Sequence, residues 1–98
     1  LLKLEIGKDP LDKANWLKSK EPVFKSDISN KRFGPGHNSF TQTKDGKQDL
    51  LVYHARNYTE IEGDPLWDPN RHTCIQTFTW NEEGFPVFGS PQTQLSIE

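Results

Sequence analysis

The chain has 98 residues, 12 basic and 14 acidic side chains and a formal net charge of −2, with 32% hydrophobic and 11% aromatic residues. The aromatic content indicates a folding sequence, but the mean hydropathy of −0.84 is low for a domain that buries its own core. We therefore expect the chain to depend on another polypeptide or to belong to a larger domain. No basic run favours nucleic acid, no apolar run could span a membrane, and the single Cys74 excludes an internal disulfide.

The first third of the chain predicts two short elements and a long loop. Alternating apolar and charged residues over 2–6 are typical of a strand. Asp9-Pro10 can cap a helix and place proline in its first turn. We expect about one helical turn over Asp12–Leu17, with Trp16 as its anchor. Residues 18–33 are predicted to form a loop.

The remainder predicts antiparallel strands joined by turns. After the sharp break at Gly34-Pro35-Gly36, strands are expected over residues 37–43, 49–55, 73–80 and 85–88. Asp45-Gly46 is a strong hairpin dipeptide between the first two. The acidic connection of residues 57–70 has a length that is usually functional or disordered. This pattern indicates one blade of a propeller, with a small sandwich or half-barrel as the alternative.

His37 follows the glycine-flanked proline at the beginning of a predicted strand, where its ring could point into a cavity. An imidazole there could bind a metal ion or hydrogen-bond a sugar hydroxyl. The alternative is a histidine that a nearby carbonyl group satisfies. His54 and Cys74 fall within predicted strands and are interpreted as packing residues.

Four carboxylates lie between Glu60 and Asp68, but their spacing does not match an EF-hand loop. They could include the carboxyl pair of a glycosidase, although a solvated loop is the commoner reason for such a cluster. Arg71 follows a proline-containing turn and could be a pre-positioned bidentate donor, or an exposed salt-bridge residue. Trp67 is the one tryptophan placed as a platform for a sugar ring, while the other two are interpreted as core anchors.

Together and in this order, these motifs resemble family 43 glycoside hydrolases, more narrowly their arabinofuranosidase and exo-arabinanase branch. The resemblance covers essentially the whole chain and is carried by Asp9–Leu11, Gly34–Phe40, Leu51–Arg56, Glu62–Pro65, Asp68–Thr73 and Trp80–Pro86. It implies an all-β fold that is incomplete on its own. Residues 1–98 would be a C-terminal fragment of a five-bladed β-propeller: residues 1–33 the end of the penultimate blade and a connection, and residues 34–98 the last blade and tail.

The resemblance also implies a function. Family members hydrolyse glycosides with inversion, using an Asp base, an orienting Asp and a Glu acid, and no segment here resembles their motifs. No catalytic residue is therefore assigned to this chain, which we expect to be inactive alone. His37 matches an axial histidine beside a central calcium or sodium ion and, with Arg71, is expected to bind substrate. The expected partner is the N-terminal portion of the same enzyme, possibly as a second chain.

The expected reaction is hydrolysis of α-L-arabinofuranosidic linkages in arabinan- or arabinoxylan-type saccharides. A β-xylosidase of the same family, acting on xylose-containing saccharides, is the first alternative. The second is a non-catalytic carbohydrate-binding β module that uses Trp67 and Trp16, and the third a structural, calcium-stabilised β domain. Extracellular and cytoplasmic locations are both compatible with the sequence.

Overall fold

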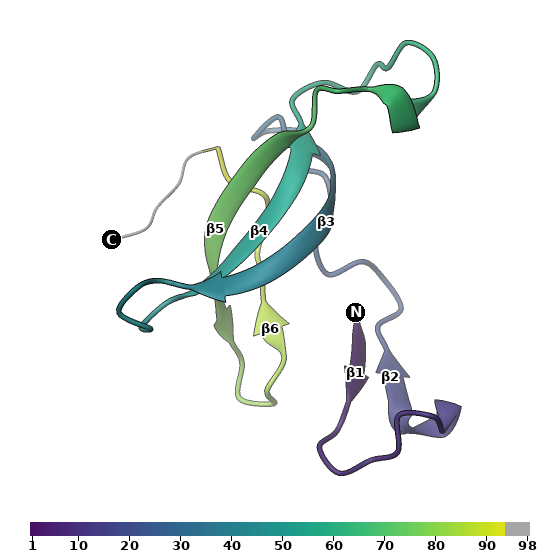
Figure 1. Ribbon diagram of the computed structural model, residues 1–98, viewed down its shortest axis with the longest axis vertical. Coiled ribbons are helices and arrows are strands. Elements are labelled where there is room, and N and C mark those ends of the chain that lie inside the picture. Colours follow the sequence, from purple (N-terminus) through teal and green to yellow (C-terminus); the bar gives the residue numbers. More distant parts are fainter. Residues whose placement is uncertain (94–98) are drawn as a thin grey trace.

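The computed structural model describes residues 1–93 and consists of strands, loops and two single-turn 3-10 helices (Figure 1). The strands are β1 Leu2–Leu4, β2 Trp16–Lys18, β3 Phe33–Gln42, β4 Asp49–Arg56, β5 His72–Trp80 and β6 Pro86–Val87. The 3-10 helices are η1 Lys13–Asn15 and η2 Pro65–Trp67. The part of the chain that the structure describes has no α-helix, and none of its helices is long and apolar enough to cross a membrane. The all-β prediction is confirmed.

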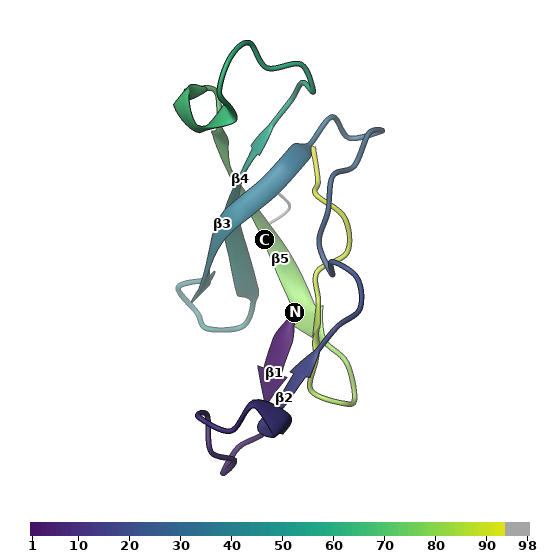
Figure 2. The ribbon, with the colours of Figure 1, turned by 90° about the vertical axis from the view of Figure 1, so that its right-hand side faces the viewer.

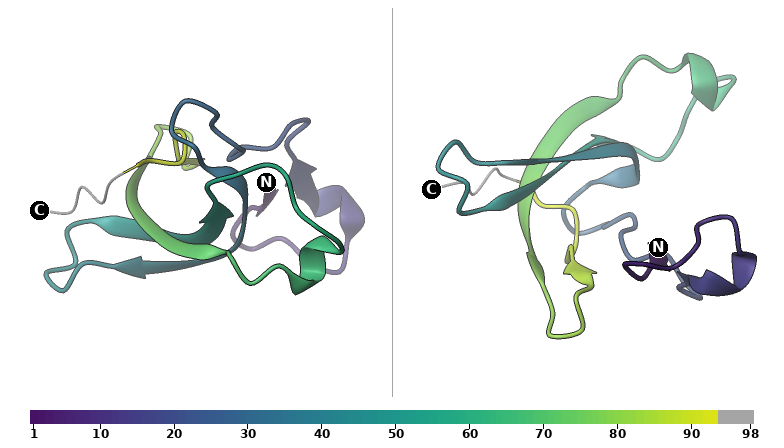
Figure 3. Two further views of the ribbon diagram at one scale, coloured as in Figure 1. Left: turned by 90° about the horizontal axis from the view of Figure 1, so that it is seen from above. Right: turned by 60° about the horizontal axis from the view of Figure 1, so that its bottom comes forward.

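A four-stranded antiparallel sheet in the order β3-β4-β5-β6 forms the body of the molecule. The strands lie side by side in the order in which they occur in the sequence, because each connection joins neighbouring strands. The long strands twist, and β5 curves strongly along its length (Figure 3). This four-stranded meander has the architecture of a propeller blade.

Strands β1 and β2 form a separate two-stranded sheet that lies below the larger one (Figure 2). Lys3 joins the two sheets, since its Nζ donates to the carbonyl of Glu83 at 3.1 Å and lies 3.9 Å from the centre of the Phe85 ring. The two sheets therefore meet at the turn that precedes β6.

The chain entering β2 differs from the prediction. The expected helical turn over Asp12–Leu17 is limited to η1, and Asp12 caps it by accepting from the Ala14 N–H at 2.9 Å. Trp16 lies in β2 opposite Leu4. Pairing with β1 satisfies the backbone of residues 16–18, so this segment is extended and the longer helix was wrong.

The first half of β3 is irregular where a break was predicted. The strand already begins at Phe33, and its register against β4 shifts between Phe33 and Gly36 and again between Gly36 and Ser39. Gly34 has a φ of 60° and His37 a φ of 49°. Such bulges let a strand continue through residues that do not fit a regular ladder. A left-handed backbone is uncommon outside glycine, although histidine adopts it more readily than most residues, and such conformations cluster at functional sites.

The turn between β3 and β4 follows the prediction closely. The Asp45 carboxylate accepts from the Thr43 hydroxyl at 2.6 Å and from the Lys47 N–H at 3.0 Å. Gly46 has a φ of 72°, in the region that glycine adopts without strain. This turn chemistry fixes the register of the hairpin.

The core lies on one face of β4. Leu51, Tyr53 and Ala55 are buried together with Phe78 of β5, and Phe24, Cys74 and Phe88 pack against them. The strand predicted over 49–55 is confirmed, and Leu51, Tyr53 and Ala55 share its buried face. A strand with both neighbours paired and one face covered has a strongly specified register.

One buried polar side chain connects this core to the segment after β6. Gln76 accepts from the Tyr53 hydroxyl at 2.9 Å and donates to the carbonyls of Phe88 and Ser90, each at 3.1 Å. Burial raises the pKa of Tyr53 to about 12, so its phenol remains protonated and donates. The backbone N–H of Gln92 adds a fourth bond to Gln76 at 3.1 Å.

Replacing this glutamine should destabilise the fold. Gln76→Leu leaves the carbonyls of Phe88 and Ser90 without their donor, and we expect the free energy of unfolding to fall by about 2–3 kcal/mol. Urea denaturation followed by tryptophan fluorescence measures the loss. Gln92→Leu is the matched control, because its side chain is exposed and only its backbone takes part. Equal losses in the two variants would contradict this role of Gln76.

Candidate functional site

Two histidines lie beside each other where β3 bulges. The rings of His37 on β3 and His54 on β4 are edge to face, with centroids 6.1 Å apart and an interplanar angle of 66°. A Cβ at Gly36 would lie 3.8 Å from Nε2 of His54, at ordinary van der Waals distance, so the His54 ring lies against the backbone of β3. His54, interpreted from the sequence as a packing residue, is half-buried beside the predicted site residue.

The surroundings of His54 keep its ring neutral. Partial burial lowers the pKa of His54, and its electrostatic interactions with Arg71, His37 and Arg56 lower it further. A neutral imidazole has one donor nitrogen and one acceptor nitrogen. It can therefore accept from one hydroxyl group of a polyol ligand and donate to another.

Arg71, the second predicted site residue, immediately precedes β5. Its Nη2 donates to the carbonyls of Pro65 and Leu66 at 3.0 and 3.1 Å. Its Nε is buried and has no hydrogen-bond partner within residues 1–93. Buried polar groups are nearly always paired, so this unpaired nitrogen sets Arg71 apart as a candidate site residue.

Among the carboxylates of the acidic loop, Asp68 is the one whose side chain is largely buried. It accepts from Nε of Arg56 at 2.8 Å, from the Tyr58 hydroxyl at 2.6 and 2.8 Å, and from the Asn70 N–H at 3.1 Å. The side chains of Arg56 and Asp68 are only 12% and 6% exposed. The interpretation of the acidic residues as a solvated loop is therefore wrong for Asp68, whereas Glu60, Glu62 and Asp64 are exposed.

These bonds fix the charge state of the cluster. The Tyr58 hydroxyl, then the Asn70 N–H and Arg56, hold the pKa of Asp68 below its usual value. The same bond to Asp68 raises the pKa of Tyr58. Asp68 is thus a permanent anion at neutral pH, with its negative charge directed at Arg56.

Both guanidinium groups hold η2. Nη2 of Arg56 donates to the Pro65 carbonyl at 3.0 Å, the same oxygen that Arg71 contacts. At the other end of the turn, Asp64 accepts from the Leu66 N–H at 3.0 Å. We call Arg56, Asp68 and Arg71 the η2 clamp. Figure 1 shows η2 on the loop that connects β4 to β5, at the end of the sheet opposite β1 and β2.

The described residues do not form a cation site on their own. No group of three or more His, Cys, Asp or Glu side chains gathers within residues 1–93. Calcium takes six to eight oxygen ligands, whereas two of the groups that act on His54 are the guanidinium groups of Arg71 and Arg56. Residues 1–93 therefore do not fit a calcium or sodium ion by themselves.

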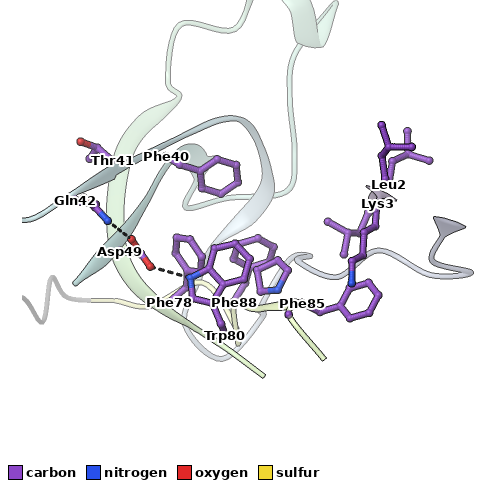
Figure 4. A pocket seen from close by; sticks show the side chains of 14 residues that line it. Leu2, Lys3, Phe40, Thr41, Gln42, Asp49, Phe78, Trp80, Phe85 and Phe88 are labelled. Atoms are coloured by element: carbon purple, nitrogen blue, oxygen red, sulfur yellow. Dashed lines mark hydrogen bonds between the residues drawn. The ribbon is translucent and has the colours of Figure 1, made fainter. Parts of the chain in front are cut away.

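A second surface feature lies between β1 and the larger sheet. It is an apolar groove of about 540 Å³ whose aromatic and aliphatic lining includes Leu2, Phe40, Phe78, Trp80, Phe85 and Phe88 (Figure 4). Phe40 and Trp80 remain 58% and 54% exposed. The Trp80 Nε1 donates to Asp49 at 2.8 Å, and both side chains line the groove. Trp80 is thus not the core anchor that the sequence predicted.

Two adjacent histidines at a strand bulge and a half-buried arginine that acts on one of them have the chemistry of a wall in a polar ligand site, carried here on a blade-like sheet. The family model of the glycosyl hydrolases family 43 matches residues 2–86. The chain belongs to this family, whose members fold as five-bladed β-propellers, and the predicted family is confirmed.

Several proteins that this chain resembles in sequence are named as α-L-arabinofuranosidases. An extracellular exo-α-(1→5)-L-arabinofuranosidase of Streptomyces avermitilis is 53% identical over 93% of this chain and 19% of that protein. Alpha-L-arabinofuranosidase 43 of Humicola insolens is 46% identical over the same shares. A solved α-L-arabinofuranosidase from Lactobacillus brevis is 55% identical, with a TM-score of 0.90 over 97% of this chain and 30% of that one. The chain spans about a fifth of the length of these curated relatives.

Removing the charge of Asp68 should give a loss of stability that depends on pH. The folded-state pKa of Asp68 is lowered from 3.8, so its contribution is complete above that value and is lost as the pH falls through the folded-state pKa. We expect Asp68→Asn to lower the melting temperature at pH 7, and its difference from the wild type to narrow below about pH 4. Differential scanning calorimetry across this range measures both.

Glu62→Gln is the control for this variant, because it removes an exposed carboxylate of the same loop. A constant difference between Asp68→Asn and the wild type at every pH would contradict the charge-based role of Asp68.

Proposed function

We propose that this chain is part of a glycoside hydrolase that cleaves α-L-arabinofuranosidic linkages with inversion, and that it forms one wall of the active site. The observation that carries the proposal is the 46–55% identity, over more than nine-tenths of the chain, to proteins named as α-L-arabinofuranosidases. The same names favour this activity over that of a β-xylosidase.

The geometry of the polar cluster supports this role. Arg71 is half-buried and its Nη2 is held by η2, so the guanidinium is fixed in place and can donate to a substrate hydroxyl or to a carboxylate through its other N–H groups. His37 is exposed beside the neutral His54 and adds further donors and acceptors for sugar hydroxyls.

The chain's own carboxylate in this cluster is unsuited to proton transfer. An inverting glycosidase needs an acid of raised pKa and a base about 6.5–9.5 Å away, with a water between them. Asp68 has a lowered pKa and is saturated by Arg56 and Tyr58. In this proposal the acid and base come from outside residues 1–98, and Arg71 helps to keep the base ionised.

The partner in this proposal is the remaining part of the same family 43 domain, whether on one polypeptide or on two. The apolar groove supports it, because Leu2, Phe40 and Trp80 line one groove and are each more than half exposed, and a contiguous exposed apolar surface marks an interaction site. An ion beside His37 belongs to the proposal only with ligands from that partner, and no step of the reaction is assigned to it.

A carbohydrate-binding module is less well supported. It was expected to use Trp67 and Trp16 together, but η2 and β2 lie at opposite ends of the molecule (Figure 1). Trp16 is also tied to its own loop, since its Nε1 donates to the Pro10 carbonyl at 2.8 Å. The two indoles therefore do not form one platform.

Activity should depend on both predicted site residues. In the complete enzyme, Arg71→Ala and His37→Ala should each lower kcat/KM on an aryl α-L-arabinofuranoside, by about a hundredfold for the arginine because a charge-assisted donor is lost. The 98-residue chain alone should hydrolyse nothing. Lys47→Ala, an exposed cation in the β3–β4 turn, is the control. Full activity of both site variants would remove these residues from the proposed wall.

Charge in the apolar groove should weaken association with the rest of the domain. With the chain and the remaining domain produced as two polypeptides, Leu2→Asp should raise the dissociation constant at least about tenfold, because a carboxylate would be desolvated. Ile28→Asp is the control: Ile28 is also exposed but does not line the groove. Calorimetry measures both, and equal affinities would refute this docking surface.

A further inference from the structure

The η2 turn presents a large aromatic surface that the proposed active-site wall does not use. Trp67 is 79% exposed, compared with 38% for Trp16 and 54% for Trp80, and its neighbour Leu66 is 67% exposed. Neither Trp67 nor Leu66 belongs to the buried core cluster or lines the apolar groove. Their side chains therefore contribute little to the folding of this chain.

This exposed indole stands on an unusually well-held piece of loop. The Pro65 carbonyl accepts from both Arg56 and Arg71, and Asp64 and Asp68, on either side of the turn, accept from backbone N–H groups at 3.0 and 3.1 Å. Side chains that bind from a fixed backbone lose less conformational entropy than those on a mobile loop. The η2 clamp therefore holds the backbone on which Trp67 stands before any ligand binds.

Trp67 is also close to Arg71, the residue that is predicted to bind the sugar. Nη2 of Arg71 donates to the carbonyl of Leu66, the residue directly before Trp67 in the chain, at 3.1 Å. Asp68, directly after it, holds Arg56. A ligand that contacts the guanidinium group of Arg71 therefore has η2 beside it.

We propose that Trp67 is an accessory sugar subsite: its indole face stacks on a ring of a pentose oligosaccharide other than the ring that is cleaved. The electron-rich face of an indole attracts the weakly positive C–H groups on one face of a sugar ring, and the contact also buries apolar surface. This inference rests on the proposed function, because it takes Arg71 to mark the reacting sugar. It adds a preference for substrates longer than one residue.

Chain-length dependence tests the subsite in the complete enzyme. Trp67→Ala should raise KM for arabinotriose about tenfold, with kcat little changed, because one aromatic contact is lost. An aryl arabinofuranoside with a single sugar should show no change in KM or kcat. Trp67→Phe should recover most of the affinity, since it restores an aromatic face.

Ile28→Ala serves as the matched control for removal of an exposed apolar side chain far along the chain from η2. Melting temperatures equal to the wild type would show that the variants fold. Equal losses on both substrates, or a lowered melting temperature, would overturn the subsite and indicate packing against the rest of the domain. Unchanged KM for arabinotriose would overturn it as well.

Failure of the proposed function gives a separate result. If the wild-type enzyme hydrolyses neither substrate, the assignment as an arabinofuranosidase fails. Calorimetric titration with arabinotriose then decides the subsite by itself. Weaker binding by Trp67→Ala than by the wild type supports it, and equal or absent binding in both overturns it.

Discussion

Leu51, Tyr53 and Ala55 enter the core from one face of β4, and the two-residue period of a strand then places His54 and Arg56 on the opposite face. Because β4 is paired on both sides, its register cannot slip without moving the core residues into solvent. The burial of three apolar side chains thus determines where two polar ones stand. The position of the candidate site follows from this constraint.

The charged side chains near η2 differ in whether their charge is balanced within the described residues. Asp68 is fully occupied by Arg56, Tyr58 and a backbone N–H, so its negative charge is balanced locally. Arg71 has no such carboxylate within the described residues and keeps a buried donor free. Both guanidinium groups hold the loop, but only the charge of Arg56 is balanced by a carboxylate among residues 1–93. A half-buried cation is stabilised by an anion or a polar ligand, and the proposal therefore places a carboxylate or a substrate hydroxyl beside Arg71.

The strands of the larger sheet were predictable because their signals are local. Alternating apolar residues in β4 and β5 and the Asp45-Gly46 turn predicted a meander, and the structure confirms it. The extent of β3 was not predictable, because Gly34 to Gly36 are typical of a break in a strand. Pairing with β4 is what allows the strand to continue through these residues as bulges. The expected helix failed for the same reason, since pairing with β1 takes Trp16 into a strand.

The sequence by itself determined the family, the all-β class and the choice of His37 and Arg71, since these depend on short motifs in a fixed order. Tertiary structure alone decided that His54 lies beside His37, that Asp68 is an internal anion, and that Trp80 lines an open groove. Each of these depends on contacts between residues that are 10 or more positions apart, such as the hydrogen bond between Tyr58 and Asp68. Local patterns carry no information about which distant side chain a residue will meet.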